Sequence, residues 1–313
     1  MFQKILVPLD GSDRAKQAIP VAARIARASG GTVILLTVTN LPNSFNMEEK
    51  RLAEVDSPEL IDENVNQAQQ YLNSVTRMPE LANVKTQVEA PMGKVAPTIL
   101  SSIELLQADL VVMCSHGYSG FKRWALGSIA QKIVPQSSVP VLLLRDGGPL
   151  LKDQPVHVLV PLDGSLLAEA ALKPTIELVA ALAPADQRSL HLIRVVDVPV
   201  SLGIFRPDTH FDQEVSRADA RREAYKYLTD MTAQLKKGDF AAHNLTVTTS
   251  VSVNADVAEA LVEKSEQAVE PFDMIAMTTH GYGGLQRWVM GSITERVLHH
   301  TKLPLLIVHA DAH

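Results

Sequence analysis

Two short segments of the chain carry residue types that bind phosphate groups. Residues 8–12 (Pro-Leu-Asp-Gly-Ser) close an apolar run that begins at residue 3, and residues 114–117 (Cys-Ser-His-Gly) are followed after nine residues by Gly127-Ser128. A glycine at a strand end lets the backbone approach a ligand closely. A Gly-Ser pair at a helix start offers free N–H groups and a hydroxyl to an anion. Together the segments predict a cradle for phosphate groups at the ends of two strands.

The commoner phosphate-binding patterns do not occur in the sequence. There is no Gly-x-x-x-x-Gly-Lys-Ser/Thr run, and no Gly-x-Gly-x-x-Gly run follows a strand. The chain is therefore predicted to be neither an ordinary P-loop protein nor a carrier of the dinucleotide-binding fingerprint.

Both segments occur twice, so the chain is an internal duplication. Residues 5–12 (Ile-Leu-Val-Pro-Leu-Asp-Gly-Ser) return as residues 158–165 (Val-Leu-Val-Pro-Leu-Asp-Gly-Ser). A second shared motif, Arg-Trp-x-x-Gly-Ser, closes the nine-residue spacing in both copies. The length of 313 residues is that of about two domains. Because a stretch rich in turn formers separates the copies, we predict one domain over residues 1–147 and another over residues 155–313.

Each copy alternates strands with helices, which is typical of a parallel sheet covered on both faces. In the first copy, Ser12 is predicted to cap a helix that runs to Ser29, and Gly127-Ser128 to open the last helix. The second copy has a longer second helix, over about residues 211–236. The predicted strands lie at residues 3–9, 32–38, 84–90, 109–113 and 139–144 in the first copy and near residues 156–162, 189–196, 245–252, 273–277 and 304–309 in the second.

With these motifs the sequence resembles a tandem universal stress protein, with two family domains covering nearly its whole length. The family's nucleotide motif is Gly, two residues, Gly, nine residues and Gly-Ser or Gly-Thr after the fourth strand. The first copy supplies Gly117 and Gly127-Ser128, and the second supplies Gly281 and Gly291-Ser292. The resemblance implies an α/β fold of two Rossmann-like domains, of the adenine nucleotide alpha hydrolase-like kind. Each would have a five-stranded parallel sheet of order 3-2-1-4-5, and a pseudo-two-fold axis would relate the two.

The resemblance also implies an adenine-nucleotide site in each copy. ATP is the expected ligand, with AMP or ADP as alternatives, and a Mg²⁺ ion would be held largely by phosphates and water. The first and second strands would supply contacts to adenine and ribose, and the motif residues would surround the phosphates. The implied binding residues are Pro8, Leu9, Asp10, Val38, Met113, Gly117, Gly127, Ser128 and Ile129 in the first copy and Pro161, Leu162, Asp163, Val195, Met277, Gly281, Gly291, Ser292 and Ile293 in the second. No catalytic or metal-ligating residue is assigned.

Both copies depart from the motif at its first glycine, which is Cys114 in the first copy and Thr278 in the second. If the position needs a left-handed backbone, a side chain there costs about 1–2 kcal/mol. If the position needs only close approach, a small side chain is tolerated. The sequence leaves open whether one copy, both or neither binds nucleotide.

Two pairs of polar residues have alternative roles. Asp10 and Asp163 either contact ribose or a metal-bound water, or accept hydrogen bonds within the Gly-Ser turn that they precede. His116 and His280 are interpreted as loop residues that bond the backbone rather than as catalytic bases, since no nucleophile or paired carboxylate lies near them in sequence.

Three functions follow as hypotheses. The first is a regulatory protein of the stress response that binds ATP and contacts unidentified protein partners. The second is a slow ATPase with Asp10 or His116 as base, and the third is a stress scaffold that no longer binds nucleotide. The resemblance implies that the last strands of the two copies pair with each other, as in an internal pseudo-dimer. Whether the whole chain also forms a homodimer is left open by the sequence.

Composition and charge argue against other classes. The net charge is −6, and neither half is basic, because residues 1–150 carry 14 basic and 14 acidic side chains and the rest carry 15 and 21. A nucleic-acid partner is therefore not predicted. No apolar run reaches about 18 residues, so no membrane span is predicted. The single cysteine and the early aspartates, where a signal peptide needs apolar residues, favour a cytoplasmic protein.

Overall fold

The computed structural model divides into two compact units, which are called unit 1 (Met1–Gly147) and unit 2 (Gly148–His313). It describes residues 2–39, 58–115, 126–145, 155–197, 208–268, 270–280 and 290–309.

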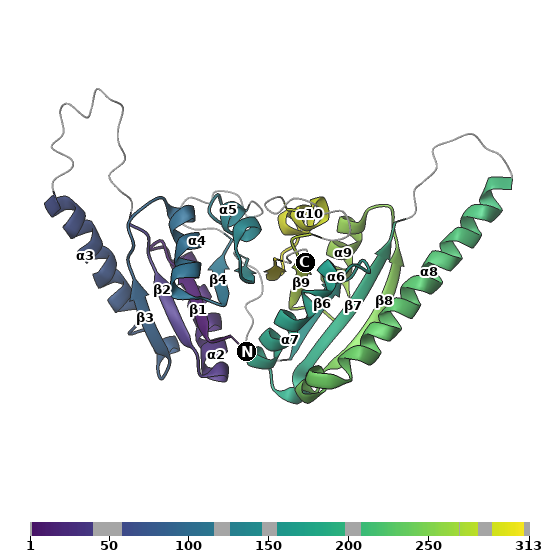
Figure 1. Cartoon of the computed structure of the whole chain (residues 1–313), viewed down its shortest axis with the longest axis horizontal. Helices are drawn as coiled ribbons and strands as arrows, with labels where there is room; N and C mark the ends of the chain where they lie inside the picture. The colour runs from purple at the N-terminus through teal and green to yellow at the C-terminus, as the bar shows by residue number, and fades with distance from the viewer. Residues whose placement is uncertain are drawn as a thin grey trace, which may run out of the picture. The chain divides into compact units, whose positions relative to one another are not determined.

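Unit 1 is built on a parallel sheet in the order β3-β2-β1-β4-β5 (Figure 1). Its central strands are continuous apolar runs, and their side chains are buried on both faces, as the sequence predicts. The strands are β1 Lys4–Pro8, β2 Thr32–Leu36, β3 Lys85–Glu89, β4 Leu110–Cys114 and β5 Val141–Leu144. The helices are α1 Asp13–Lys16, α2 Ala18–Ser29, α3 Pro58–Val75, α4 Val95–Leu106 and α5 Ala130–Gln136, with one 3₁₀ turn, η2 Pro79–Leu81.

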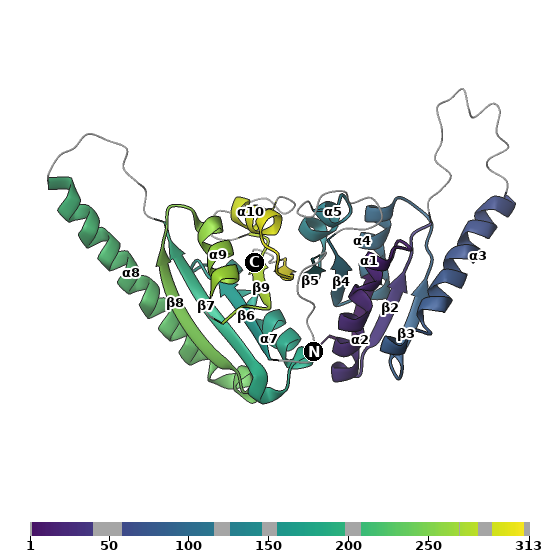
Figure 2. The same cartoon turned by 180° about the vertical axis from the view of Figure 1, so that it is seen from behind.

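Unit 2 repeats this plan, with its parallel strands in the order β8-β7-β6-β9-β10 (Figure 2). Numbered within each unit, both sheets have the order 3-2-1-4-5, so the predicted fold class is confirmed. The strands are β6 Val156–Pro161, β7 Arg188–Val196, β8 Thr246–Val253, β9 Met274–Thr278 and β10 Leu305–Val308. The helices are α6 Leu166–Glu169, α7 Leu172–Leu182, α8 Asp208–Leu235, α9 Val257–Gln267 and α10 Ser292–His300, with 3₁₀ turns η3 Ala185–Gln187 and η4 Gly238–His243.

The helices of each unit cover both faces of its sheet. Right-handed crossovers place the helices that follow the first and second strands on one face and those that follow the third and fourth on the other. In agreement, α4 packs on α5 in unit 1 and α9 packs on α10 in unit 2. Because the strands are parallel, all their carboxyl ends lie at one edge of the sheet, where the predicted binding loops begin.

The helix predicted from Ser12 to Ser29 is broken in two. The Ser12 hydroxyl caps α1 by accepting a hydrogen bond from the N–H of Ala15 at 3.1 Å, as predicted, but α1 ends at Lys16. Pro20 lies in the first turn of α2 and has no N–H to donate to the carbonyl of Lys16, so the helix cannot run continuously through this point. Pro174 produces the same break between α6 and α7 in unit 2.

The last helix of unit 1 also begins later than predicted. Its first residue is Ala130 rather than Gly127-Ser128, whereas α10 in unit 2 begins at Ser292, in the matching Gly-Ser pair. The N–H of Gln131 already donates to the carbonyl of Gly127 at 2.9 Å. The backbone therefore already makes a helical hydrogen bond before Ala130. The later start of α5 reflects an irregular first turn at the end of the helix.

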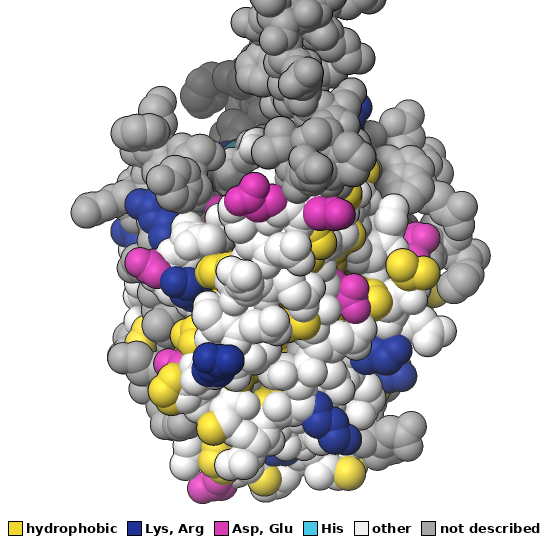
Figure 3. Space-filling model, turned by 90° about the vertical axis from the view of Figure 1, so that its left-hand side faces the viewer, with side chains coloured by type: hydrophobic (Ala, Val, Ile, Leu, Met, Phe, Trp, Pro, Cys, Tyr) yellow, Lys and Arg dark blue, Asp and Glu magenta, His cyan; other side chains and the backbone are white. Residues whose placement is uncertain are grey.

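One face of unit 1 carries side chains of both charges (Figure 3). Figure 3 looks at the side of unit 1 where α3 and β3 lie, and basic, acidic and hydrophobic side chains are interspersed on it. In the described part of the chain, no helix combines the length and the apolar character needed to cross a membrane.

Candidate functional site

The edge of the unit 2 sheet contains a pocket of about 90 Å³. The carboxyl ends of β6, β7 and β9 form one side, and the first two turns of α9 with the first turn of α10 form the other. Most of the lining is apolar, with four polar side chains among it. The lining residues are Pro161, Leu162, Asp163, Ala168, Ile193, Val195, Val257, Leu261, Met277, Thr278, His280, Ile293 and Thr294.

The loop after β6 presents Asp163 to this pocket. Oδ1 of Asp163 accepts hydrogen bonds from the N–H of Ser165 at 2.9 Å and from its hydroxyl at 2.6 Å. The Ser165 hydroxyl in turn accepts from the N–H of Ala168 at 3.1 Å and caps α6. Gly164 between them has φ +90°, a left-handed value that a side chain disfavours. The carboxylate is thus held in place by the turn and still lies at the pocket.

Unit 1 has the same loop geometry after β1. Oδ1 of Asp10 accepts from the N–H of Ser12 at 3.0 Å and from its hydroxyl at 2.6 Å, and Gly11 has φ +85°. Both aspartates therefore have the turn-fixing role, which was one of the two alternatives for them.

The residues that replace the first motif glycine are unstrained, since neither Cys114 nor Thr278 has a positive φ. The Thr278 hydroxyl donates to the carbonyl of His280 at 2.6 Å and so holds the start of the following loop. The thiol of Cys114 instead donates to the carbonyl of Arg14 in α1 at 2.9 Å. This position therefore does not require a left-handed backbone, and each side chain makes a hydrogen bond within its own unit.

Gly291 brings the start of α10 against the loop after β9. Its N–H donates to the carbonyl of Thr279 at 2.8 Å, and a Cβ added to Gly291 would lie 3.1 Å from that oxygen. In unit 1 the N–H of Gly127 makes the equivalent hydrogen bond to Ser115 at 2.8 Å. The N–H groups of these two glycines are therefore bonded to the preceding loop. In unit 2 the N–H groups of the next residues, Ser292 and Ile293, lie in the first turn of α10, where a helix has no partners of its own for them.

Two histidines flank a buried hydroxyl at one side of the pocket. The Thr279 hydroxyl lies 3.2 Å from Nδ1 of His280 and 3.4 Å from Nδ1 of His309. Burial, and then the nearby His309, lower the pKa of His280, so its ring is neutral at pH 7. In unit 1 the position of His309 is taken by Arg145, a buried side chain whose pKa burial lowers to about 10, so that it stays charged at neutral pH.

The structure brings most of the predicted unit 2 residues together. Pro161, Leu162, Asp163, Val195, Met277 and Ile293 all line the one pocket, and Gly291 and Ser292 lie directly before Ile293. Gly281 lies outside the described residues. The prediction did not include the lining residues Ala168, Ile193, Val257, Leu261, Thr278, His280 and Thr294.

The predicted unit 1 residues occupy the same places in their own sheet. The N–H of Leu9 donates to the carbonyl of Leu36 at 2.8 Å, just as that of Leu162 donates to Ile193 at 2.8 Å. This register puts Pro8, Leu9 and Asp10 beside the end of β2, and Val38 two residues beyond it. Met113 is buried in β4, and Gly127, Ser128 and Ile129 lead into α5. His116 and Gly117 lie outside the described residues.

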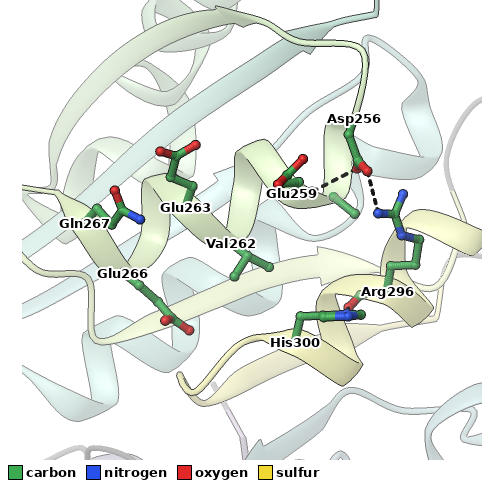
Figure 4. Close-up of a pocket in the computed structure, with 9 residues that line it drawn as sticks. Asp256, Glu259, Val262, Glu263, Glu266, Gln267, Arg296 and His300 are labelled. Carbon is green, nitrogen blue, oxygen red and sulfur yellow. Dashed lines mark hydrogen bonds and ion pairs between the residues drawn. The ribbon is translucent and has the colours of Figure 1, made fainter.

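A second and larger pocket, of about 510 Å³, lies between α9 and α10 of unit 2 (Figure 4). At one end Asp256 caps α9 through the N–H of Glu259 and pairs with Arg296 at 2.5 Å. Glu263 and Glu266 extend the acidic side along α9. Within the described residues no cluster of His, Cys, Asp and Glu is arranged to hold a metal ion, so this groove is not assigned one.

Comparison with known proteins identifies relatives of both units. The model of the universal stress protein family matches residues 1–145 and again residues 156–309. A universal stress protein of Methanocaldococcus jannaschii is 31% identical over 145 residues, which are 46% of this chain and 83% of that protein. One from Mycolicibacterium smegmatis is 25% identical and covers 97% of this chain and 96% of its own length. The crystal structure of a universal stress protein from Archaeoglobus fulgidus superposes with a TM-score of 0.62 at 22% identity, covering 98% of this chain and 96% of that one.

Proposed function

The chain belongs to the universal stress protein family, and from this premise we propose that it is a regulatory protein that binds an adenine nucleotide, ATP or in its place AMP or ADP. We propose one site at the pocket of unit 2 and an equivalent site in unit 1. We place the protein in the cytoplasm, where occupancy of the sites would alter contacts with protein partners during stress.

One observation carries this proposal. Six residues that the nucleotide motif and its neighbouring strands predict, from β6, β7, β9 and α10, line a single pocket at the carboxyl edge of the sheet. Open parallel sheets bind their ligands at this edge. The apolar side chains of Val195, Leu261 and Met277 suit the faces of a purine base, and Asp163 supplies an acceptor for ribose hydroxyls.

The size of the pocket fits one part of a nucleotide. Pockets for drug-sized ligands have about 300–1,000 Å³, whereas this one has about 90 Å³. We therefore assign it the base, with the ribose beside Asp163. The phosphates would extend to the start of α10, where the N–H groups of Ser292 and Ile293 point out of the helix and its dipole favours anions. A Mg²⁺ ion would be held by the phosphates, so we assign it no protein ligand.

The test is a calorimetric titration of nucleotide-stripped, full-length protein with ATP and Mg²⁺. We expect one or two sites per chain with a Kd of about 1 μM, which is ~8 kcal/mol. Gly291→Val should remove the unit 2 site, because its side chain would press on the Thr279 carbonyl, and Gly127→Val should remove the unit 1 site. Glu295→Gln, an exposed change in α10, is the matched control. A folded protein that takes up no ATP, AMP or ADP would favour the stress scaffold instead.

A further inference from the structure

A tyrosine from the long outer helix reaches the binding loop in both units. In unit 2, Tyr227 of α8 donates its hydroxyl hydrogen to Oε1 of Glu169, at the end of α6, at 2.9 Å. The guanidinium of Arg194 lies over the Tyr227 ring, 5.3 Å from its centroid. On its other side this guanidinium touches the loop, since a Cβ on Gly164 would lie 3.3 Å from Nη1 of Arg194.

These contacts surround the loop that carries Asp163. Arg194 lies in β7 between two pocket residues, Ile193 and Val195, but points to the opposite face of the sheet, where α8 packs. Glu169 ends the short helix that Ser165 caps. Burial first, and then the hydrogen bond to Glu169, raise the pKa of Tyr227, so its hydroxyl remains a donor at neutral pH.

Unit 1 places a tyrosine in the same position. Tyr71-Leu72 of α3 corresponds to Tyr227-Leu228 of α8, and both leucines are fully buried. The ammonium of Lys16 lies 5.9 Å from the centre of the Tyr71 ring and pairs with Asp13 at 2.9 Å. The Tyr71 hydroxyl is buried, and burial raises its pKa, whereas the nearby charge of Lys16 opposes the shift and the carboxylates of Asp10 and Asp13 add to it.

The charged partners of the tyrosine differ between the units while the arrangement persists. Where unit 1 has Asp13, Lys16 and Thr37, unit 2 has Leu166, Glu169 and Arg194. The cation beside the ring is Lys16 of the short helix α1 in unit 1 and Arg194 of the strand β7 in unit 2. In unit 2 the tyrosine hydroxyl also has an acceptor, Glu169. Each tyrosine ring thus retains one cation beside the Asp-Gly-Ser loop.

We propose that Tyr227 with Arg194 and Glu169 in unit 2, and Tyr71 with Lys16 in unit 1, are positioning residues that hold the Asp-Gly-Ser loop in its binding conformation. A left-handed glycine leaves this loop many alternatives, and a guanidinium packed between the ring and Gly164 removes them before a ligand arrives. The loop is thereby joined to the outer helix. The effect of these positioning residues on nucleotide affinity rests on the proposed function, but their effect on the loop conformation does not.

The test exchanges the two sets of charges in the full-length protein without nucleotide. Glu169→Lys and Arg194→Thr, made singly, should each speed amide hydrogen exchange over residues 162–168 by about 5- to 10-fold, because each removes a partner of Tyr227. The triple variant L166D/E169K/R194T restores the unit 1 set and should return exchange to within about 2-fold of the parent chain. Tyr225→Phe, on the exposed side of α8, is the matched control and should change nothing.

The outcomes separate this proposal from the nucleotide proposal. Exchange over residues 9–15 of unit 1 is the internal standard, and exchange in β6 reports any general loss of unit 2 stability. Single variants that leave the loop unchanged, or a triple variant as fast as the singles combined, would overturn the positioning role. If the parent chain binds no nucleotide in calorimetry, the proposed function fails while the exchange result still decides this one. If it binds, the single variants should weaken ATP binding about 5- to 10-fold and the triple variant should recover it.

Discussion

Thr294 of α10 donates its hydroxyl hydrogen to the backbone carbonyl of Thr278, the last residue of β9, at 2.9 Å. Both side chains are buried, and Thr278 passes the connection on through its own hydroxyl to the carbonyl of His280. Two threonines therefore join the first turn of α10, the end of the strand and the start of the motif loop. Unit 1 has Ala130 where unit 2 has Thr294, so this link belongs to unit 2.

Thr294→Val should destabilise unit 2 while nearly preserving the shape of the side chain. It leaves the buried carbonyl of Thr278 without this donor, which we expect to lower the free energy of unfolding by about 1–2 kcal/mol. Urea denaturation of the full chain, fitted with one transition for each unit, measures the loss. Thr294→Ser keeps the hydroxyl and should cost less. Equal losses in the two variants would show that packing, not the hydrogen bond, is what matters.

Thr278→Val tests the residue that replaces the first motif glycine. Without the hydroxyl the carbonyl of His280 loses its 2.6 Å partner, and the loop start should loosen. If unit 2 binds ATP as proposed, affinity should fall about 5- to 10-fold in calorimetry, the equivalent of one lost hydrogen bond. Thr278→Ser is the control that should bind like the parent chain. A valine variant with unchanged affinity would mean that the hydroxyl has no part in shaping the loop.

Most of the sheet could be predicted because its central strands are continuous apolar runs. β1, β4 and their unit 2 counterparts are buried on both faces, so the sequence shows them without alternation. The helix break after α1 was not predicted, although Pro20 and Pro174 are each the third residue of the helix that follows the break. A proline is tolerated in the first turn of a helix, so its presence alone does not show whether a helix starts there or continues. In a continuing helix the proline would have no N–H to donate to the carbonyl four residues before it.

The candidate site was predicted from its loops, and the residues missed come mainly from regular elements. Ile193 shares a strand face with Val195, so the two-residue period of a strand would have added it. Val257 and Leu261 are four residues apart in α9, a spacing that puts both on one helix face. Nothing in their own sequence says that this face turns to the nucleotide motif, because that depends on how α9 packs against β7.

Ser12→Ala and Ser165→Ala should have equal effects, because the two caps have the same geometry. Each serine accepts from the N–H three residues on at 3.1 Å and donates to an aspartate at 2.6 Å. Loss of such a cap costs about 1 kcal/mol, with a range of about 0.5–2 kcal/mol. Denaturation of the single and double variants measures it, and the double variant should show the sum, since the caps belong to separate units. A clear inequality would indicate that the outer-helix tyrosines support the two loops to different degrees.

His191 should make unit 2 less stable in mild acid. Its ring nitrogens lie 2.8 Å from the Thr248 hydroxyl and 2.7 Å from that of Ser250, and its ring packs on Phe272 with centroids 5.5 Å apart. Burial, and then the charge of Lys264, lower the pKa of His191 from 6.5 to about 4. The native state therefore keeps the ring neutral while the unfolded chain takes up a proton.

The sign of the pH effect follows from this difference. Above pH 6.5 the ring is neutral in both the native and the unfolded state, so the histidine adds no pH dependence. Between pH 6.5 and about 4 only the unfolded state binds the proton, so the stability of the native state falls as the pH falls. The full shift would correspond to about 3 kcal/mol, which we reduce to about 1–2 kcal/mol because the ring is only half-buried. Urea denaturation at pH 7.5 and pH 4.5 should show a parent chain that loses about this much more than His191→Gln, in which the carboxylates titrate as before and the imidazole is gone. If the two chains lose the same stability between these pH values, His191 is protonated in the native state without penalty, and its pKa in the native state is not lowered.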